Sequence, residues 1–423
     1  MTLAYNKSGD QTQETQYVQC CIAGCGPAGA MLGFLLARQG IKVLVLEKHK
    51  DFLRDFRGDT IHPSTLQIMD ELGLVDQLLQ LPHTKASHLQ VRTSRELLVS
   101  ADFSRLKTRW PYMVFLPQWD FLNFLVEQAN HFPCFHLIMQ AEAQEIIEDG
   151  EKVSGIRYRK DDNWHSVYAP LTVAADGRSS RMRAQARLTP QEMSPPMDVL
   201  WFQLSRDKDD PEETFFSISA GHIIGLINRG DYWQIAYAIS KGAEQFLEED
   251  LPQFKQTIGK LVPWLSKQLD EIQTPEQLKL LVVQANRLQR WYRPGLLCIG
   301  DAAHAMSPIG GVGINLAIQD AVVAANTLIE PLKEGSLRTD QLAAIQRERM
   351  WPTRLTQALQ SMLQRRLATP ALQFTNTVPR LPLPVRMILR LPGIRDLPAH
   401  LICLGVRPVH VKNCSLASTS SSS

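Results

Sequence analysis

Three glycines, at positions 24, 26 and 29, have the G-x-G-x-x-G spacing of a phosphate-binding loop. An apolar run at 18–23 predicts a buried strand before them, and residues 30–39 predict a helix after them. In such a unit Gly24 permits a tight turn, Gly26 lets the backbone approach a pyrophosphate, and Gly29 lets helix and strand pack closely. The helix N-terminus then offers unpaired N–H groups and a partial positive charge to the phosphates.

An acidic residue, Glu47, ends the next predicted strand at 41–46. A carboxylate at this point accepts hydrogen bonds from ribose hydroxyls. A strand, a glycine loop, a helix, a strand and an acid in this order predict a dinucleotide site. The alternative is a glycine turn that serves packing alone.

A second glycine-rich loop lies near the other end of the chain. A buried strand is predicted at 295–299 and is followed by Gly300-Asp301-Ala302-Ala303-His304, by Pro308 and by the run GGVGIN at 310–315, before a predicted helix at 316–328. Two such loops indicate a ligand that is held from both ends, and FAD is a ligand of that kind. Its phosphates would lie at the first helix and its flavin ring at the second, where a helix N-terminus stabilises the negative charge of the reduced ring. A tight turn for packing is again the alternative.

The overall composition excludes several classes of protein. The 423 residues carry a net charge of +2, which does not favour a nucleic-acid partner. The seven cysteines form no C-x-x-C pair, so we expect no bound metal and a reducing, cytoplasmic location. Residues 1–16 lack the apolar core of a signal peptide, and no apolar run reaches the roughly 20 residues of a membrane-spanning helix.

The later part of the chain predicts a second sheet and a helical end. Several strands are predicted between residues 198 and 240, far from the glycine motif in sequence, and residues 342–367 predict a helix. From the end of that helix onward the chain is rich in proline, leucine and cations: Arg365, Arg366, Arg380, Arg386, Arg390, Arg395, Arg407 and Lys412. A segment of this type forms either a packing arm or a peripheral contact with a membrane surface.

With these motifs in hand, the chain resembles the single-component (group A) flavin monooxygenases of the para-hydroxybenzoate hydroxylase-like superfamily, over residues 17–328. Three motifs carry the resemblance in the family's order. They are the first glycine loop with Glu47, the D-G-x-x-S-x-x-R pattern that begins at Asp176 and ends at Arg183, and the Gly300–Pro308 segment.

The resemblance implies an α/β fold with a Rossmann-like, glutathione-reductase-type FAD domain, an inserted mixed β-sheet substrate domain and a helical C-terminal region. We expect the FAD domain at 17–85, 111–187 and 285–335, the substrate domain at 86–110 and 188–284, the helical region at 336–412, and disordered tails at 1–16 and 413–423.

The resemblance also implies roles for single residues. Asp301 would hold the ribityl chain, and residues 311–315 would meet the pyrimidine edge of the flavin. Arg57 would contact the cofactor and Pro308 would lie on its reactive side, and these two are the expected catalytic residues. The full implied set of cofactor-binding residues is Gly24, Gly26, Ala28, Gly29, Glu47, Lys48, Arg57, Gln118, Ala143, Asp176, Gly300, Asp301, Pro308, Gly311, Gly313, Ile314 and Asn315.

The implied activity is that of an NAD(P)H- and O2-dependent monooxygenase. NAD(P)H would reduce tightly bound FAD and leave. The reduced flavin would form a C4a-hydroperoxide with O2 and hydroxylate or epoxidise an aromatic or other electron-rich small molecule. The enzyme would be a monomer or a homodimer.

One departure from the family concerns the substrate. Benzoate hydroxylases bind a carboxylate through a serine and an arginine on a substrate-domain strand, whereas the comparable stretch here, 222–226, has no arginine before Arg229. We therefore expect an apolar or larger substrate. The candidate pocket residues are Trp201, Phe216, His222 and Tyr237, and the alternative for each is a place in the core or on the surface.

Three other functions fit the same motifs. A flavin halogenase would carry W-x-W-x-I-P, and none of the eight tryptophans lies in that pattern. An FAD-dependent dehydrogenase or reductase, or a flavoprotein that acts as a redox-tuned binding module, would show the same FAD motifs.

Overall fold

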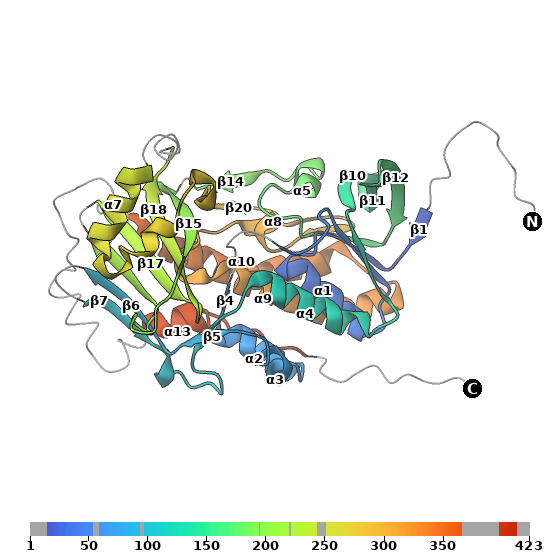
Figure 1. Cartoon of the computed structure of the whole chain (residues 1–423). Coiled ribbons are helices and arrows are strands. Elements are labelled where there is room, and N and C mark those ends of the chain that lie inside the picture. The colour runs from blue at the N-terminus through green and yellow to red at the C-terminus, as the bar shows by residue number, and fades with distance from the viewer. Residues whose placement is uncertain are drawn as a thin grey trace, which may run out of the picture.

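The computed structural model describes residues 15–53, 59–93, 97–193, 195–219, 221–242, 251–365 and 397–412. Figure 1 shows two lobes that lie side by side. One lobe contains α1, α4 and β10–β12, and the other contains β6, β7, β15–β18 and α7. The chain passes between the lobes several times, as the order of strands in each sheet also shows.

The first lobe is built on a six-stranded sheet in the order β21-β22-β13-β2-β3-β9. Five of its strands are parallel, and β21 is antiparallel at one edge. The central strands are buried on both faces, as expected of a parallel sheet covered on two sides. The strands are β2 (Cys20–Ala23), β3 (Val43–Glu47), β9 (Phe135–Met139), β13 (Leu171–Ala174), β21 (Tyr292–Arg293) and β22 (Leu296–Cys298).

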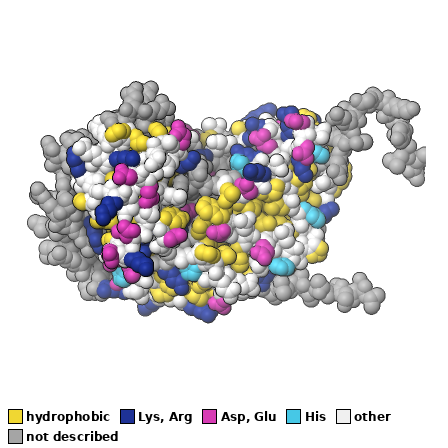
Figure 2. All heavy atoms as spheres, viewed as in Figure 1, with side chains coloured by type: hydrophobic (Ala, Val, Ile, Leu, Met, Phe, Trp, Pro, Cys, Tyr) yellow, Lys and Arg dark blue, Asp and Glu magenta, His cyan; other side chains and the backbone are white. Residues whose placement is uncertain are grey.

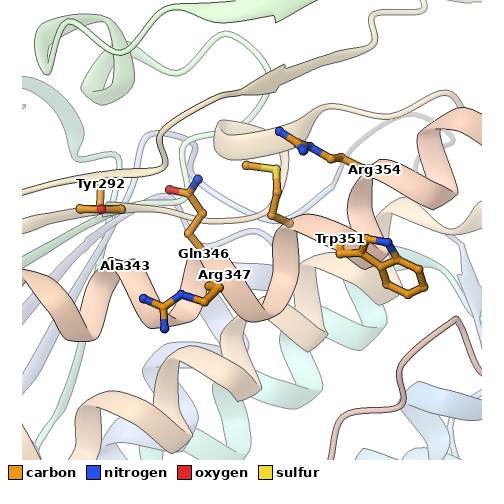
Figure 3. A pocket seen from close by; sticks show the side chains of 7 residues that line it. Tyr292, Ala343, Gln346, Arg347, Trp351 and Arg354 are labelled. Atoms are coloured by element: carbon orange, nitrogen blue, oxygen red, sulfur yellow. The ribbon is translucent and has the colours of Figure 1, made fainter.

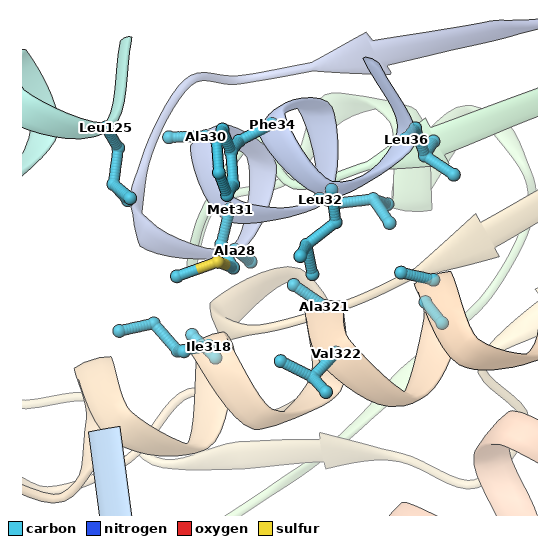
Figure 4. Close-up of a cluster of buried hydrophobic side chains, with 14 of the residues drawn as sticks. Ala28, Ala30, Met31, Leu32, Phe34, Leu36, Leu125, Ile318, Ala321 and Val322 are labelled. Atoms are coloured by element: carbon cyan, nitrogen blue, oxygen red, sulfur yellow. The ribbon is translucent and has the colours of Figure 1, made fainter. Parts of the chain in front are cut away.

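Helices α1 (Pro27–Arg38), α4 (Gln118–Asn130) and α9 (Gly313–Glu334) pack together in the core on one face of this sheet. Figure 4 shows α1 against α9, with Ala28, Leu32, Ala321 and Val322 in the contact. The small alanine side chains let the two helix backbones approach closely.

The expectation that no apolar segment has the length of a membrane span is wrong. The helical stretch Ile309–Glu334 is long and apolar enough, with a mean hydropathy of 1.4 over its most apolar window. In the structure 83% of that window is buried, so the apolar character of α9 is accounted for by its place in the core.

The opposite face of the six-stranded sheet carries a four-stranded sheet, in the order β1-β12-β11-β10. Its strands are β1 (Thr15–Tyr17), β10 (Glu142–Asp149), β11 (Lys152–Lys160) and β12 (Asn163–Tyr168). Thr15 and Gln16 pair with Ser166 and Val167, which corrects the expectation of disorder for these two residues. Residues 1–14 and 413–423, the rest of the expected tails, lie outside the described residues.

The second lobe is built on a seven-stranded sheet in the order β19-β15-β18-β17-β16-β6-β7. Only the β16–β6 pair is parallel, so this sheet is mixed. Helix α7 (Leu251–Leu261) covers one of its faces. The strands are β6 (His88–Thr93), β7 (Leu97–Asp102), β15 (Met197–Ser205), β16 (Phe215–Ser219), β17 (His222–Asn228), β18 (Tyr232–Ser240) and β19 (Lys279–Leu281).

The remaining elements are short strands, helices and 3-10 turns, together with the long helix α10. The short strands are β4 (Thr60–Ile61), β5 (Thr84–Ala86), β8 (Met113–Phe115), β14 (Pro190–Glu192) and β20 (Asn286–Leu288). The remaining α-helices are α2 (Pro63–Glu71), α3 (Val75–Leu78), α5 (Arg181–Gln185), α8 (Asp301–His304), α10 (Thr339–Leu363) and α13 (Leu397–Cys403). The 3-10 turns are Phe103–Arg105, Pro263–Leu265, Gln268–Glu271, Pro275–Gln277 and Ile309–Gly311.

The basic C-terminal segment is described only in part. Arg407 lies 4.0 Å from Glu348 of α10, and the backbone N–H of Lys412 donates to Asn326 of α9. These contacts are those of a packing arm. Arg366, Arg380, Arg386, Arg390 and Arg395 lie outside the described residues.

Charges of both signs are interspersed on the surface. On the face shown in Figure 2, lysine and arginine alternate with acidic side chains, and apolar side chains gather in the middle. This distribution agrees with the small net charge of +2.

Gly29 gives a test of how closely α1 packs on the glycine loop. A Cβ at this position would lie 1.9 Å from the Gly24 carbonyl oxygen, whereas a Cβ at Gly259 of α7 would make only ordinary contacts of 3.4 Å or more. We expect Gly29→Ala to lower the free energy of unfolding by about 3 kcal/mol. Gly259→Ala should leave it unchanged or raise it by up to about 1 kcal/mol. Urea denaturation measures both, and equal stability of the two variants would contradict the close approach.

Candidate functional site

The first glycine loop brings two strand ends into contact. Gly24 has a φ of +95°, and a Cβ there would lie 2.4 Å from the carbonyl oxygen of Ala175 and 2.9 Å from the Cα of Asp176. Only glycine fits this backbone and this space. The end of β2 is thus set directly against the end of β13.

Gly26 is different, because no protein atom lies within 4 Å of the position a Cβ would take. Its φ of −73° is open to any residue, so neither strain nor a protein contact requires glycine here. The open space lies at the N-cap of α1, where the first N–H groups of the helix have no partner within the helix. This is the geometry that a pyrophosphate needs.

Glu47 ends β3 beside this loop and is 7% exposed. One of its carboxylate oxygens accepts from the Cys25 N–H at 3.0 Å, and the other accepts from the backbone N–H of His49 at 3.1 Å and lies 2.6 Å from its ring. This places a carboxylate at the end of β3 beside the loop, where an acid can accept from ribose hydroxyls. Burial raises the pKa of the Cys25 thiol far above its usual value, so this cysteine stays protonated and unreactive.

Asp176 organises the second motif. Its two oxygens accept from the Ser180 hydroxyl at 2.5 Å and from the Met182 N–H at 3.0 Å. Burial raises the pKa of this carboxyl, although these hydrogen bonds oppose the shift. Arg183 donates to the carbonyl of Ala302 at 3.1 Å. The second motif therefore connects the first glycine loop with the third motif.

The third motif meets the first one at Gly300. A Cβ on Gly300 would lie 3.1 Å from the Cβ of Ala28 and 3.3 Å from that of Ala317. Ala28 thus contributes the small side chain that lets the two loops meet. Asp301 follows and is partly exposed, and its carboxylate forms no hydrogen bond or ion pair with any residue in the described part of the chain. An acceptor of this kind beside the loop suits a ribityl hydroxyl.

The loop before α9 completes this side of the site. Pro308 accepts from the Gly311 N–H at 3.1 Å, and a Cβ on Gly311 would lie 2.8 Å from the Thr60 side chain. A Cβ on Gly313 would meet nothing within 4 Å. The N–H groups of Gly313 and Ile314 lie in the first turn of α9, where no earlier carbonyl of the helix reaches them.

Asn315 holds this loop rather than presenting its side chain to a ligand. Its oxygen accepts from the His62 N–H at 2.9 Å and from the Thr65 hydroxyl at 2.8 Å, and its amide donates to the carbonyls of Thr60 and Gly311 at 3.0 Å. All these bonds go to protein atoms. Only the backbone N–H of Asn315 is therefore left for the flavin, so the expected contact of this residue with the pyrimidine edge would be made by its main chain.

A buried charged cluster behind the loop was not found from the sequence. Asp320 of α9 accepts from the Gly300 N–H at 3.0 Å, lies 2.5 Å from the His304 ring and accepts from Arg349 Nε at 2.8 Å. Asp320 and Arg349 are fully buried and His304 is 1% exposed. Although burial alone would raise the pKa of Asp320, His304 and Arg349 together lower it. The sequence signal was Asp320 itself, an acid inside an apolar helix.

Three other expected cofactor residues are placed as follows. Lys48 is exposed next to Glu47, Ala143 of β10 packs against the core on the far side of the sheet, and Gln118 begins α4. Arg57 lies outside the described residues. The structure thus brings the three motifs to one place, and the roles of these four residues stay predictions.

The candidate substrate residues divide between the two faces of the seven-stranded sheet. Trp201, Ala236, Gly225 and Phe216 are paired in one row across four strands, so their side chains share a face. On this face Ile309, which lies in the loop before α9, packs with Met197, Ala238 and Ile223. We call this loop the flavin loop, and the row therefore lies on the side of the sheet that meets it.

His222 and Tyr237 lie on the other face, which corrects their grouping with Trp201 and Phe216. Tyr237 contacts Phe254 of α7 with ring centroids 5.7 Å apart, and its hydroxyl lies 2.6 Å from His222 Nδ1. Burial lowers the pKa of His222 and raises that of Tyr237 to about 12. The alternation of side chains along a strand could have separated the pairs, but only once the strand register was known.

Arg229, the cation nearest the substrate strand in sequence, is already paired. Its guanidinium binds the Asp59 carboxylate and donates from Nε to Gln234 at 2.7 Å, and both charged side chains are at most 7% exposed. Burial raises the pKa of Asp59 and Arg229 opposes that shift. Arg229 is therefore engaged with the protein and is poorly placed to bind a substrate carboxylate.

These observations fit FAD. The open space at Gly26 and Gly313 is what a pyrophosphate at one helix and a flavin at another require. Glu47 and Asp301 supply acceptors for ribose and ribityl hydroxyls. Among the described residues no group of three or more His, Cys, Asp or Glu residues is arranged to hold a metal ion.

Gly26→Val tests the pyrophosphate position. Because Gly26 has an ordinary backbone and open space around it, the variant should fold with an unchanged melting temperature as apoprotein. The branched side chain would occupy the ligand space, so the purified protein should be colourless. Flavin absorbance per protein measures this, and a fully loaded yellow variant would refute the placement.

Arg349→Met tests the charged cluster. Removing one partner of a buried ion pair should lower the free energy of unfolding by about 3–5 kcal/mol at pH 7. The neighbouring Glu348→Gln, which alters only a half-exposed 4.0 Å contact, should change it by less than about 1 kcal/mol. Because the pKa of Asp320 is lowered, the stabilisation by the cluster is present at pH 7 and is lost only as the pH falls below about 4. Urea denaturation at pH 7 and at about pH 3, below the usual Asp pKa, measures both, and equal effects of the two variants at pH 7 would contradict the cluster.

Comparison with known proteins agrees with this geometry. A family model described as an FAD binding domain matches residues 17–355. The chain is 29% identical over 352 residues to 6-methylpretetramide 4-monooxygenase of Streptomyces rimosus, covering 82% of this chain and 84% of that one. It is 23% identical over 325 residues to para-nitrophenol 4-monooxygenase of Pseudomonas sp. (strain WBC-3), covering 74% and 78%.

The fold is shared with solved structures. The crystal structure of p-nitrophenol 4-monooxygenase from Pseudomonas putida DLL-E4 superposes with a TM-score of 0.72 at 21% identity, covering 93% of this chain and 95% of that one. Since the family model spans most of the chain, the chain belongs to this FAD-binding family, the para-hydroxybenzoate hydroxylase-like flavin monooxygenases, and is an FAD-dependent oxidoreductase.

Proposed function

We propose that the enzyme hydroxylates an aromatic, largely apolar small molecule held between the flavin loop and the row Trp201-Ala236-Gly225-Phe216. The observation that carries this proposal is the row itself. Trp201 and Phe216 lie in this row on the sheet face that meets Ile309, and the Phe216 ring lies over Gly225, where a Cβ would be 2.5 Å from it. A face of this kind is apolar and aromatic, which suits an aromatic substrate.

Trp201 adds a polar group to this face. Its ring packs with Ala86, Phe115 and Ile227. Its indole N–H is buried and has no hydrogen-bond partner in the described part of the chain. A buried donor without a partner is unfavourable, so a substrate oxygen that accepts from it gains affinity. We infer that the substrate is an oxygen-bearing aromatic compound rather than a simple carboxylate, in keeping with the engagement of Arg229 by Asp59.

The chain's own groups have defined tasks in this proposal. Bound FAD supplies hydride acceptance from NAD(P)H and activation of O2. The N–H groups of Gly313 and Ile314 stabilise negative charge on the pyrimidine edge of the ring. Ile309 and the aromatic row keep water away from the substrate side. Pro308 lies in the turn that carries Ile309, and its carbonyl accepts from the Gly311 N–H and so helps to hold that turn.

We also infer the finer organisation of the chain. The parallel order β22-β13-β2-β3-β9 supports a glutathione-reductase-type Rossmann arrangement, with the FAD domain at 17–85, 111–187 and 285–335 and the substrate domain at 86–110 and 188–284. The six cysteines of the described residues are all free thiols, which supports a cytoplasmic location. The relatives named for para-nitrophenol and 6-methylpretetramide are both monooxygenases, which supports oxygen insertion over simple dehydrogenation.

The decisive experiment follows the oxygen. Holoenzyme is incubated with NAD(P)H, 18O2 and a panel of phenols and multi-ring aromatic compounds, and products are identified by mass spectrometry. One 18O atom in a product supports the proposal. NAD(P)H oxidation that yields only hydrogen peroxide across the panel would favour a reductase or dehydrogenase and overturn it.

Trp201→Phe tests the substrate face. Loss of the indole N–H removes one hydrogen bond to the substrate, which is worth about 1 kcal/mol, so the KM for the aromatic substrate should rise about fivefold. Tyr237→Phe, on the opposite face, should leave this KM unchanged. Steady-state kinetics with a substrate found in the labelling experiment measures both. The reverse pattern would place the substrate on the α7 side.

A further inference from the structure

A groove on the outer edge of the FAD lobe is not used by the site described above. We call it the α10 groove. It has a cavity volume of about 390 Å3. It is lined by Tyr292, Ala343, Gln346, Arg347, Met350, Trp351 and Arg354. Figure 3 shows that these side chains lie along one face of α10, with Tyr292 reaching in from the neighbouring edge strand β21.

The α10 groove gathers positive charge without an acidic partner. Arg347 and Arg354 line it, Arg290 stacks on the Tyr292 ring at 4.7 Å, and Arg287 lies close enough to Arg354 to feel its charge. Burial lowers the pKa of Arg287, and the like charge of Arg354 adds to that shift. None of these four guanidinium groups pairs with a carboxylate among the residues that the structure describes, whereas Arg92, Arg157 and Arg293 each do.

The same groove exposes an aromatic ring. The Trp351 side chain is 58% exposed, on a helix that buries its other face in the core. The exposed indole ring is available to stack on a planar group. Trp351 and Arg354 are three residues apart and Arg347 and Trp351 four, so the ring is flanked by a cation one helical turn away on each side.

The floor of the groove is fixed. The side chain of Gln346 accepts from the backbone N–H of Trp291 at 2.9 Å and donates to the Gln289 carbonyl at 2.7 Å. These two bonds tie α10 to the segment before β21. Met350 is buried between them. A rigid floor lowers the entropy that a ligand would have to overcome on binding.

We propose that the α10 groove binds an adenine nucleotide, with the base on Trp351 and the phosphates on Arg347 and Arg354. Guanidinium groups bind phosphate through paired N–H donors, and an exposed indole stacks on a purine. A cavity of this volume is at the lower end of the range for small-molecule sites, which suits one nucleotide unit. The site shares no residue with the three FAD motifs, so it is separate from the FAD site and does not depend on oxygenation.

Two sources could supply this ligand, a free nucleotide such as ADP or the adenylate half of the NAD(P)H donor. FAD-loaded enzyme is titrated with ADP, with adenosine and with inorganic phosphate by isothermal titration calorimetry. ADP should bind saturably and at least tenfold more tightly than either part alone. Arg347→Ala/Arg354→Ala and, separately, Trp351→Ala should each weaken ADP binding at least tenfold. Arg407→Ala removes a cation that contacts α10 outside the groove and should leave it unchanged.

Further measurements on the same samples distinguish the two sources of the ligand, and they distinguish failure of this proposal from failure of the proposed oxygenation. If NADPH displaces ADP and its KM rises in the arginine variant, the donor is the source, whereas an unchanged KM identifies a free nucleotide. Absence of saturable ADP binding, or equal weakening in Arg407→Ala, overturns the proposal. Flavin content and NAD(P)H oxidation are recorded for every variant, so that failure of the proposed oxygenation is visible as a separate result.

Discussion

The close approach of backbones at the two glycine loops is the constraint on which the site depends. Gly24 leaves no room for a side chain between the ends of β2 and β13, and Gly29 leaves none between α1 and the loop that precedes it. At the other end Gly300 meets Ala28 across a distance that only small side chains allow. Because these contacts are steric, they fix where the N-termini of α1 and α9 lie, and both helices then present free N–H groups to one elongated ligand.

Polar contacts behind this steric frame keep the loops in place. Asp320 holds the Gly300 N–H from within α9 and is neutralised by His304 and Arg349, while Asn315 ties the start of α9 to Thr60 and His62. Neither group lies open to solvent. Ions in a protein interior are unfavourable unless they are paired, so the cluster adds specificity to the loop position at some expense in desolvation. The flavin loop is consequently shaped by residues that do not themselves face the cofactor.

The two lobes are joined across the substrate side by a buried ion pair. Asp59 stands before β4 in the FAD lobe and Arg229 in the turn between β17 and β18 of the second sheet. The pair orients the sheet so that one face meets Ile309 and the other is covered by α7. It also engages the cation that a carboxylate substrate would have used, and an apolar aromatic face remains.

Local sequence determined the FAD loops of this protein. The glycine spacing, the strand and helix periods and the acid at Glu47 are fixed by chain geometry within residues 18–47, so they could be predicted. The strands of the second sheet between residues 198 and 240 followed from similar local signals, whereas the mixed pairing of that sheet was expected only from the family resemblance. Tertiary structure alone decided which side chains share a face, because strand register is set by partners far away in sequence. It separated Trp201 and Phe216 from His222 and Tyr237, gave Asp320 its partner Arg349, and turned the long apolar helix α9 into a core element. Each of these outcomes depends on packing between distant segments, for which a single sequence carries no local signal.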